Sequence, residues 1–212
     1  MAKFNRHEPH REKSSDDLYF SVGGFVFEVV KIFLLAFIVI VPIRMFLFQP
    51  FFVQGASMEP NFEDNQYLII SEFGYKTVPI GIGSVNFSTV KSFRNINRET
   101  VIVFHYPLDR KKFFIKRIIG LPGEKVEVRN GAVKIYNSDN PEGQVLDESG
   151  YLSSNLKTMG DLVISLKDDE YFVMGDNRRF SSDSRSWGPI KKSDIVGVTL
   201  LRAWPLNQLA IF

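Results

Sequence analysis

The sequence predicts a mostly β protein in which one domain of antiparallel strands follows a single apolar helix. Three observations support this fold class. Phe, Ile, Leu and Val dominate residues 20–52; beyond residue 60, short runs rich in Val, Ile, Phe and Tyr are separated by turn signals; and no helical segments alternate with those runs. Regularly spaced short strands with tight turns are typical of an antiparallel sheet or a barrel-like domain.

The apolar segment is interpreted as a transmembrane anchor helix over residues 20–49. Its uncharged part, residues 32–43, is too short by itself to cross about 30 Å of hydrocarbon. The span becomes long enough if Glu28 and Lys31, three residues apart, pair on one helix face and if the Arg44 side chain extends toward the other interface. A buried core helix is the alternative, but no later segment is suited to cover so many apolar side chains.

Charge asymmetry predicts the orientation of this helix. No Lys or Arg follows Arg44 until Lys76. The positive-inside rule therefore places the polar tail, residues 1–19, in the cytoplasm and the rest of the chain outside the cytoplasmic membrane. The length of the tail also disfavours a cleaved signal peptide, so a single permanent anchor is expected. The cations before the uncharged part are Lys3, Arg6, Arg11, Lys13 and Lys31.

The remaining residues, 50–212, are expected to form one extracytoplasmic β domain. Residues 75–98 are polar and Gly-rich, which indicates a loop or small insert, and residues from about 130 to 170 are expected to form a cap-like insert. The strand-like runs are YLIIS, TVIVFHY, KFFIKRIIG, KVEV, AVKIY, DLVISL, EYFVMG and IVGVTLLRAW.

Composition excludes several kinds of chemistry. The chain has no cysteine, so disulfides, thiolate zinc sites and cysteine nucleophiles are excluded. His7 and His10 precede the apolar segment and His105 follows it, so a three-histidine metal site on one side of a membrane is excluded. The net charge of +2, without a basic stripe or a phosphate-binding glycine motif, points away from nucleic acid. We expect no cofactor and no metal.

Ser57 is a candidate nucleophile because the GASMEP turn follows the apolar segment directly. A solvated turn serine is the simpler interpretation for any one serine, and a nucleophilic serine also needs a base. His105 is the one histidine on the same side of the membrane, but it lies at an expected strand end, an ordinary place for a surface histidine. GASME also differs from the GxSxG turn of α/β-hydrolases.

Lys116, in KFFIKRIIG, is a candidate base. To be neutral, its pKa must fall from about 10.4 to near 8, at a cost of about 3 to 4 kcal/mol, which requires a dry site. As strand neighbours on the same face, Phe114 and Ile118 are large and apolar. Lys116 is therefore either buried for a function or extends from a sheet edge. For comparison, Lys134 has Ala132 and Tyr136 on its face and is expected to face solvent.

The stretch MGDNRRFSSDSRSWGP, residues 174–189, follows an apolar strand. It is either a long turn held by side-chain hydrogen bonds or part of a site. A neutral amine needs hydrogen-bond partners that are not carboxylates, because a nearby negative charge restores its proton. Serine hydroxyls meet this need, and Asp183 can be neutralised by Arg185.

These three stretches, in this order, resemble those of type I signal peptidases, the membrane-anchored serine proteases that remove signal peptides. The resemblance covers the anchor to about residue 187 and rests on GASMEP, FFIKRIIGLPGE and GDNRRFSSDSRSWG. It implies a mostly antiparallel β domain with an inserted cap. It also implies that Ser57 is the nucleophile and Lys116 its general base, in a Ser-Lys dyad that forms an acyl-enzyme.

The resemblance assigns supporting roles and shows departures. Ser181 corresponds to the serine near the lysine amine, Asp183 and Arg185 to the pair that braces this region, and Asn177 to the last residue of the GDN motif. Asn61 stands where the family has threonine, Glu124 where it has aspartate, and Gly55 where some members have a serine whose hydroxyl helps to hold the oxyanion. The oxyanion would therefore rest more on the Ser57 backbone N–H. Residues expected to line shallow apolar substrate pockets are Phe51, Val53, Phe62, Phe114 and Ile115.

The implied partners are exported preproteins, the lipid bilayer and possible secretion machinery. Two alternatives stay open from the sequence: a catalytically inactive, membrane-anchored binding domain, and a related Ser-Lys autoprotease of the repressor-cleaving type. Intact Ser57, Lys116 and Ser181 favour activity over the first alternative. The apolar anchor and the lack of a DNA-binding helix pair disfavour the second.

Overall fold

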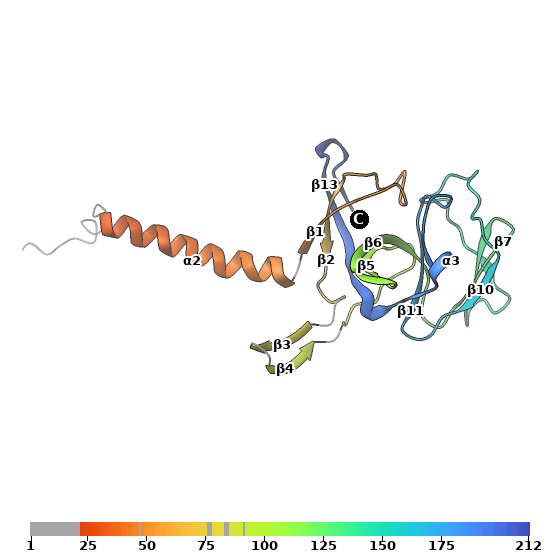
Figure 1. The fold of residues 1–212 in the computed structure, drawn as a ribbon, viewed down its shortest axis with the longest axis horizontal. Coiled ribbons are helices and arrows are strands. Elements are labelled where there is room, and N and C mark those ends of the chain that lie inside the picture. The colour runs from red at the N-terminus through yellow and green to blue at the C-terminus, as the bar shows by residue number, and fades with distance from the viewer. Residues whose placement is uncertain (1–21, 47, 76–77, 83–84, 91) are drawn as a thin grey trace, which may run out of the picture. The chain divides into compact units, whose positions relative to one another are not determined.

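The computed structural model describes residues 22–212 except 47, 76–77, 83–84 and 91 (Figure 1). The expected tail, residues 1–19, lies outside the described residues. The chain separates into two compact units, which divide after Arg44: the first contains most of an N-terminal helix, and the second is the β domain. The mostly antiparallel β fold that the sequence predicts is confirmed, since the described strand pairs are antiparallel.

The N-terminal helix, α2 (Val22–Phe46), is long and apolar enough to cross a membrane. Its 18-residue window Gly23–Ile40 has a mean hydropathy of 2.4, and none of it is buried in the structure. The expected pair forms, with Lys31 Nζ 2.9 Å from Glu28 Oε2. The helix ends before the expected anchor boundary at residue 49, and β1 (Phe48–Phe52) begins there instead. Pro50 has no backbone N–H and cannot continue a helix, which is consistent with this earlier end.

The largest sheet has eight strands in the order β1-β2-β13-β5-β6-β11-β12, with β14 paired to β13. It is built from segments far apart in the sequence, because β13 from the C-terminal end lies between β2 and β5 (Figure 1). The strand bounds are β2 Tyr67–Ser71, β5 Val101–Tyr106, β6 Asp109–Gly120, β11 Glu170–Met174, β12 Ile190–Lys191, β13 Ile195–Trp204 and β14 Ala210–Ile211.

Two smaller sheets lie in or beside the segments expected to be inserts. A four-stranded sheet in the order β10-β7-β8-β9 overlaps the expected cap-like insert, although β7 precedes residue 130, and a two-stranded hairpin, β3-β4, lies within the Gly-rich segment. Their bounds are β3 Val78–Ile82, β4 Val85–Val90, β7 Lys125–Arg129, β8 Ala132–Tyr136, β9 Gln144–Val145 and β10 Leu162–Ser165. Short helical segments are α3 Ser184–Trp187, η1 Lys192–Asp194 and η2 Leu206–Gln208.

Both faces of the large sheet are buried at β5 and β6. Along β5, Val101 and Val103 belong to one apolar cluster, whereas Ile102 and Phe104 belong to another on the opposite face. Side chains alternate between the two faces of a strand. A strand that is covered on both faces therefore needs an uninterrupted apolar run such as VIVF. The centre of β6 therefore passes through the interior of the domain.

Among the strand edges that stay unpaired within the described residues, two lie near the end of β1 and the first part of β6. β1 pairs with β2 alone, and β11 pairs with β6 only through Arg117, Ile118 and Gly120. The part of β6 before Arg117 therefore has β5 on one side and no strand on the other. Unpaired edges carry free backbone N–H and C=O groups that an extended peptide can pair with.

Candidate active site

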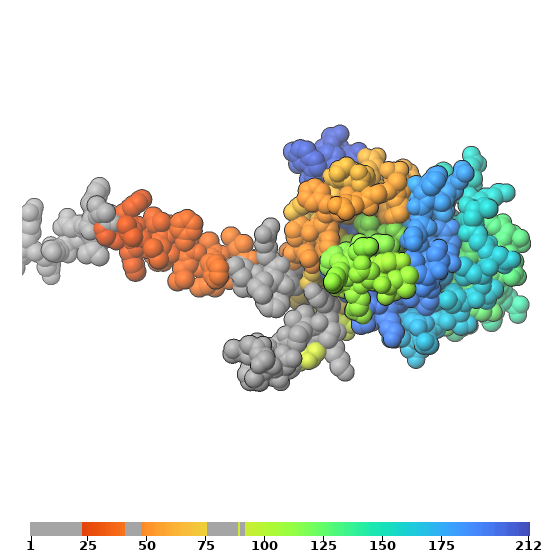
Figure 2. All heavy atoms as spheres, in the orientation of Figure 1, coloured from red at the N-terminus to blue at the C-terminus, as the bar shows by residue number. Residues whose placement is uncertain are grey.

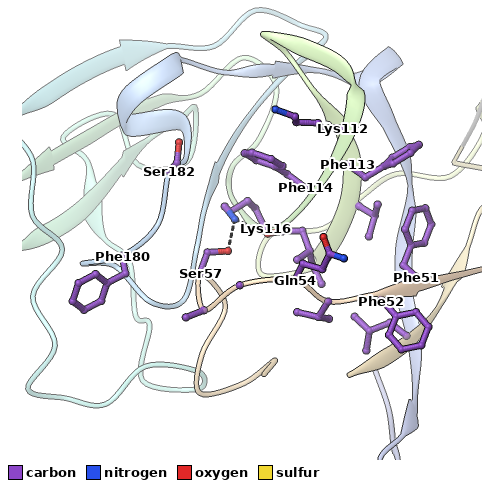
Figure 3. Close-up of a pocket in the computed structure, with 16 residues that line it drawn as sticks. Phe51, Phe52, Gln54, Ser57, Lys112, Phe113, Phe114, Lys116, Phe180 and Ser182 are labelled. Atoms are coloured by element: carbon purple, nitrogen blue, oxygen red, sulfur yellow. Dashed lines mark hydrogen bonds between the residues drawn. The ribbon is translucent and has the colours of Figure 1, made fainter. Parts of the chain in front are cut away.

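The structure brings Ser57 and Lys116 into direct contact. Lys116 lies on β6, Ser57 lies in the turn after β1, and the Lys116 Nζ is 2.6 Å from the Ser57 Oγ (Figure 3). The same nitrogen donates to the Ile115 carbonyl at 2.9 Å. When the amine is neutral, the hydroxyl can donate its proton toward it, so this contact can act as a nucleophile and its base.

Burial makes Lys116 a weaker base than an ordinary lysine. Its side chain belongs to the buried part of β6 and only 3% of the residue is exposed. The Nζ also lies 5.4 Å from the centre of the Phe114 ring. Burial lowers the pKa of Lys116 to about 8, although the charges of Asp183 and Asp176 act in the opposite direction. Desolvation therefore outweighs the two carboxylates, as the dry environment predicted from Phe114 and Ile118 requires.

Asp183 is fully buried and paired with a guanidinium. It is the N-cap of α3, and Arg185 donates from Nε and from Nη2 to its two oxygens, both at 2.8 Å. The Gly175 N–H donates to Oδ2 at 3.1 Å. Burial alone would raise the pKa of Asp183, but the hydrogen bonds and charge of Arg185 and the Gly175 amide hold it below its ordinary value. The expected neutralisation by Arg185 is present.

A second buried carboxylate, Asp176, ties the nucleophile turn to β6. Arg117 donates to it from Nε at 2.8 Å and from Nη2 at 2.5 Å. Asn61 donates from Nδ2 to Asp176 at 2.9 Å and to the Tyr151 carbonyl at 2.7 Å. The asparagine that replaces the family threonine is therefore used, because its amide bridges a buried carboxylate and a backbone carbonyl. Both carboxylates that influence Lys116 have an arginine partner, which limits their effect on the amine.

Three hydrogen bonds fix the turn that carries Ser57. The Asn177 N–H donates to the Ser57 carbonyl at 3.1 Å, and its side-chain amide donates to the Ala56 carbonyl at 3.0 Å. The Gly55 N–H donates to Asp64 at 2.7 Å. Gly55 has a φ of +85°, a conformation that favours glycine. The Ser57 N–H donates no hydrogen bond to any described residue, so it is available to a bound carbonyl oxygen.

Gly175 allows the backbone to approach this turn closely. A Cβ at Gly175 would lie 2.3 Å from the Ser57 carbonyl oxygen and 2.3 Å from the Ser181 Oγ. Real Cβ atoms do not come so near backbone atoms, so a side chain here would displace the nucleophile turn. The first position of the GDN motif therefore requires glycine, because any side chain there would collide with the Ser57 turn.

A groove of about 730 Å³ opens beside the Ser57–Lys116 pair. The segment after β1, the β5-β6 hairpin and the segment after β11 meet on the face seen in Figure 2. Phe51, Phe52 and Phe113 lie toward one end of the groove and Phe180 and Ser182 toward the other, with the pair between them (Figure 3). The other residues that line it are Val53, Gln54, Gly55, Ala56, Leu68, Val103, Lys112, Phe114 and Ile115.

A family model for signal peptidases, described as signal peptidase, peptidase S26, matches residues 26–204. The chain belongs to the signal peptidase family. Signal peptidase I P of Bacillus subtilis subsp. natto is 33% identical over 187 residues, covering 87% of this chain and 92% of that protein. Signal peptidase IB of Staphylococcus aureus (strain Mu50) is 30% identical over 190 residues, covering 82% and 86%.

A further relative is a probable signal peptidase I-2 of Synechocystis, 31% identical over 87% of this chain and 76% of that protein. A crystal structure of a signal peptidase I from Enterococcus faecalis V583 is 31% identical, with a TM-score of 0.41, and covers 50% of this chain and 98% of that one. The sequence-based prediction of a signal peptidase with serine endopeptidase activity is confirmed at the level of the family.

Within this signal peptidase, most of the expected site residues gather around Ser57. Asn177 contacts the nucleophile turn, and Asp183 and Arg185 form their pair. The Ser181 Oγ is buried beside Gly175, near the site, but the Lys116 Nζ bonds to Ser57 and to the Ile115 carbonyl rather than to Ser181. His105 lies outside the groove, where its Nδ1–H donates to the Arg110 carbonyl at 2.8 Å.

Four of the five expected pocket residues line the groove, and Phe62 does not. Phe62 is 1% exposed and packs in the apolar cluster that contains Val53, Met58 and Leu68. Its place four residues after Met58, in the turn that returns to β2, directs its ring inward. The prediction for Phe62 relied on its closeness to Ser57 in the sequence, and that closeness does not tell whether a side chain lies in the core or lines the groove.

Sequence reasoning missed the support from Asp176, Arg117 and Asn61. Side chains alternate along a strand, so Arg117 points away from Lys116, but no sequence pattern indicated a buried carboxylate on that side. An arginine between Ile115 and Ile119 was a usable signal, because a charged group on an apolar face requires a partner.

Proposed function

We propose that this signal peptidase cleaves its substrates with Ser57 as the nucleophile and Lys116 as the general base. The observation that carries the proposal is the 2.6 Å contact between Ser57 Oγ and an Nζ on a residue that is 3% exposed. A lysine that loses its proton near pH 8 can serve as a base, whereas an exposed lysine stays charged.

The proposed reaction has two halves. Neutral Lys116 takes the proton of the Ser57 hydroxyl while Oγ attacks the scissile carbonyl, and the free Ser57 N–H donates to the oxyanion. The Lys116 ammonium then gives the proton to the leaving amine. In the second half, Lys116 accepts a proton from water as the water attacks the acyl-enzyme ester, and it gives this proton to the Ser57 Oγ when the ester C–O bond breaks, which restores the free serine and the neutral amine. Gly55 has no hydroxyl to add to the oxyanion contact.

The proposed substrate lies extended in the groove. The unpaired edges of β1 and β6 approach it from two sides, and each offers backbone groups to an added strand. Phe51, Val53, Phe114 and Ile115 supply its apolar lining and would leave room for small side chains before the cut. Of the supporting residues, Asn177 holds the Ser57 turn through two hydrogen bonds, and the Asp183–Arg185 pair braces the segment after β11 on which Ser181 lies.

The proposed location is the outer face of the cytoplasmic membrane. Helix α2 would anchor the chain, with the cations of the tail in the cytoplasm, and residues 50–212 would lie outside. The preproteins would be cleaved while their signal peptides are still in the bilayer. The exposed Phe52 would enter the lipid interface, and contact with the secretion machinery would follow from this location.

The assignment is tested by assaying the purified full-length chain on a preprotein. Ser57→Ala and Lys116→Ala should each reduce kcat/KM by at least about 1,000-fold, because each removes one member of a unit that works together. His105→Ala should retain activity. Cleavage by Ser57→Ala at the rate of the unchanged enzyme would rule out this nucleophile.

A further inference from the structure

The groove carries positive charge that the proposed chemistry does not use. Within the described residues, its charged lining side chains are Lys112 and Lys116, and no acidic side chain lines it. Lys116 belongs to the catalytic pair. Lys112 contributes nothing to the reaction, yet it lies on the same strand and lines the same groove (Figure 3).

The Lys112 amine is available to a ligand. Its side chain is 66% exposed, and its one ion pair among the described residues, with the partly exposed Asp109, has an Nζ–Oδ2 distance of 3.5 Å. Exposed pairs of this kind contribute little and exchange readily for another carboxylate. The neighbouring Lys111 is also exposed but does not line the groove.

We propose that Lys112 is a specificity-determining residue that binds an acidic side chain of the substrate about four residues before the cut. This proposal rests on the proposed use of the groove by the substrate. Lys112 is four positions before Lys116 on β6, so their Cα atoms are about 13 Å apart in an extended strand. A peptide added along this strand advances by the same rise, so its fourth residue from the scissile bond is level with Lys112.

The direction follows from the lining of the groove. Moving along β6 from Lys116 toward Lys112 passes Phe113, whose ring meets the Phe51 ring at 5.3 Å at the apolar end of the groove. That apolar end is the half assigned above to the residues before the cut. An acidic side chain there would meet a cation, whereas a basic side chain would meet a like charge.

The test is a charge-reversal series with the full-length chain in zwitterionic detergent. One preprotein substrate carries Glu, Gln or Lys at each of positions two to six before the cut, and kcat/KM is measured for the unchanged enzyme, Lys112→Glu and Lys111→Glu. The unchanged enzyme should prefer Glu over Lys at about the fourth position by about two- to fivefold, the range of an exposed ion pair. Lys112→Glu should reverse that preference, and Lys111→Glu, the matched control, should keep it.

Salt should weaken the preference, because exposed charges are screened at high ionic strength. An unchanged preference in Lys112→Glu, or an equal reversal in Lys111→Glu, would overturn the proposal. So would a preference that emerges only when anionic lipid is added, since Lys112 would then act on the bilayer surface. Ser57→Ala is assayed beside these variants. If Ser57→Ala still cleaves the substrate, the proposed catalytic site is wrong. If Ser57→Ala is inactive but Lys112→Glu keeps the preference of the unchanged enzyme, only the role of Lys112 is wrong.

Discussion

At the scale of single residues, the protonation of Lys116 depends on opposing contributions from its surroundings. Burial favours the neutral amine, whereas Asp183 and Asp176 favour the ammonium, and burial is the larger effect. Each carboxylate is paired with a neighbouring arginine, Asp183 with Arg185 and Asp176 with Arg117, and its influence on Lys116 can be removed by substitution.

Replacing Asp183 with asparagine should lower the pH at which the enzyme becomes active. The variant removes a negative charge that raises the pKa of Lys116 and leaves the Arg185 cation unpaired, and both changes disfavour the ammonium. The midpoint of the kcat/KM profile should move to lower pH. Asp168→Asn, at an exposed position, is the control and should leave the midpoint in place. An upward movement for Asp183→Asn would contradict the electrostatic account.

At the scale of elements, the cap-like insert supports the segment after β11. The Arg178 side chain is fully buried and donates to Glu148 of the insert at 2.9 Å, to Thr158, and to the Gly175 carbonyl at 3.1 Å. Gly175 is the residue that touches the Ser57 turn. The Arg178 guanidinium is therefore one of the links between the insert and the catalytic pair.

Glu148→Gln should destabilise the β domain by about 3 kcal/mol, because it leaves a buried guanidinium without its counter-charge. Thermal or denaturant unfolding measures the loss. Asp147→Asn, the exposed neighbour, should change stability by less than about 0.5 kcal/mol. If Glu148→Gln unfolds like the unchanged protein, the buried pair does not hold the insert.

The sequence predicted the elements with strong periodicity better than those without it. The runs YLIIS and IVGVTLLRAW coincide with β2 and β13, because a period of two or a short apolar run bounded by turns is specific. The first strand was not predicted, and the expected anchor, residues 20–49, overlaps its first two residues, since Phe48–Phe52 continues the same composition. The β3-β4 hairpin lacked a signal beyond a Gly-rich segment.

For the site, the order of the three motifs along the chain identified Ser57 and Lys116, but it did not identify the residues that support them. Tertiary pairing across sheets brings Asn61, Asp176 and Arg117 together, and no spacing within one segment encodes such a network. Lys112 lies in a predicted strand, but its place in a groove depends on which strand edges stay unpaired.

At the scale of the whole molecule, the account predicts a single-pass membrane protein with its β domain outside. Carbonate should leave the chain in the membrane fraction, because α2 carries an 18-residue apolar window with none of its residues buried in the protein. Protease added outside intact spheroplasts should digest the β domain and spare a tag at the N-terminus. Digestion of the tag but not of the β domain would reverse the proposed orientation.

The most direct test of the central claim is the pH dependence of kcat/KM for the unchanged enzyme. If buried Lys116 is the base, the rate should rise about tenfold per pH unit below pH 8 and level off above it, with a midpoint near the lowered pKa of about 8. A midpoint near 10.4, the pKa of a free lysine, or near 6.5, that of a histidine, would contradict catalysis by a desolvated Lys116 amine.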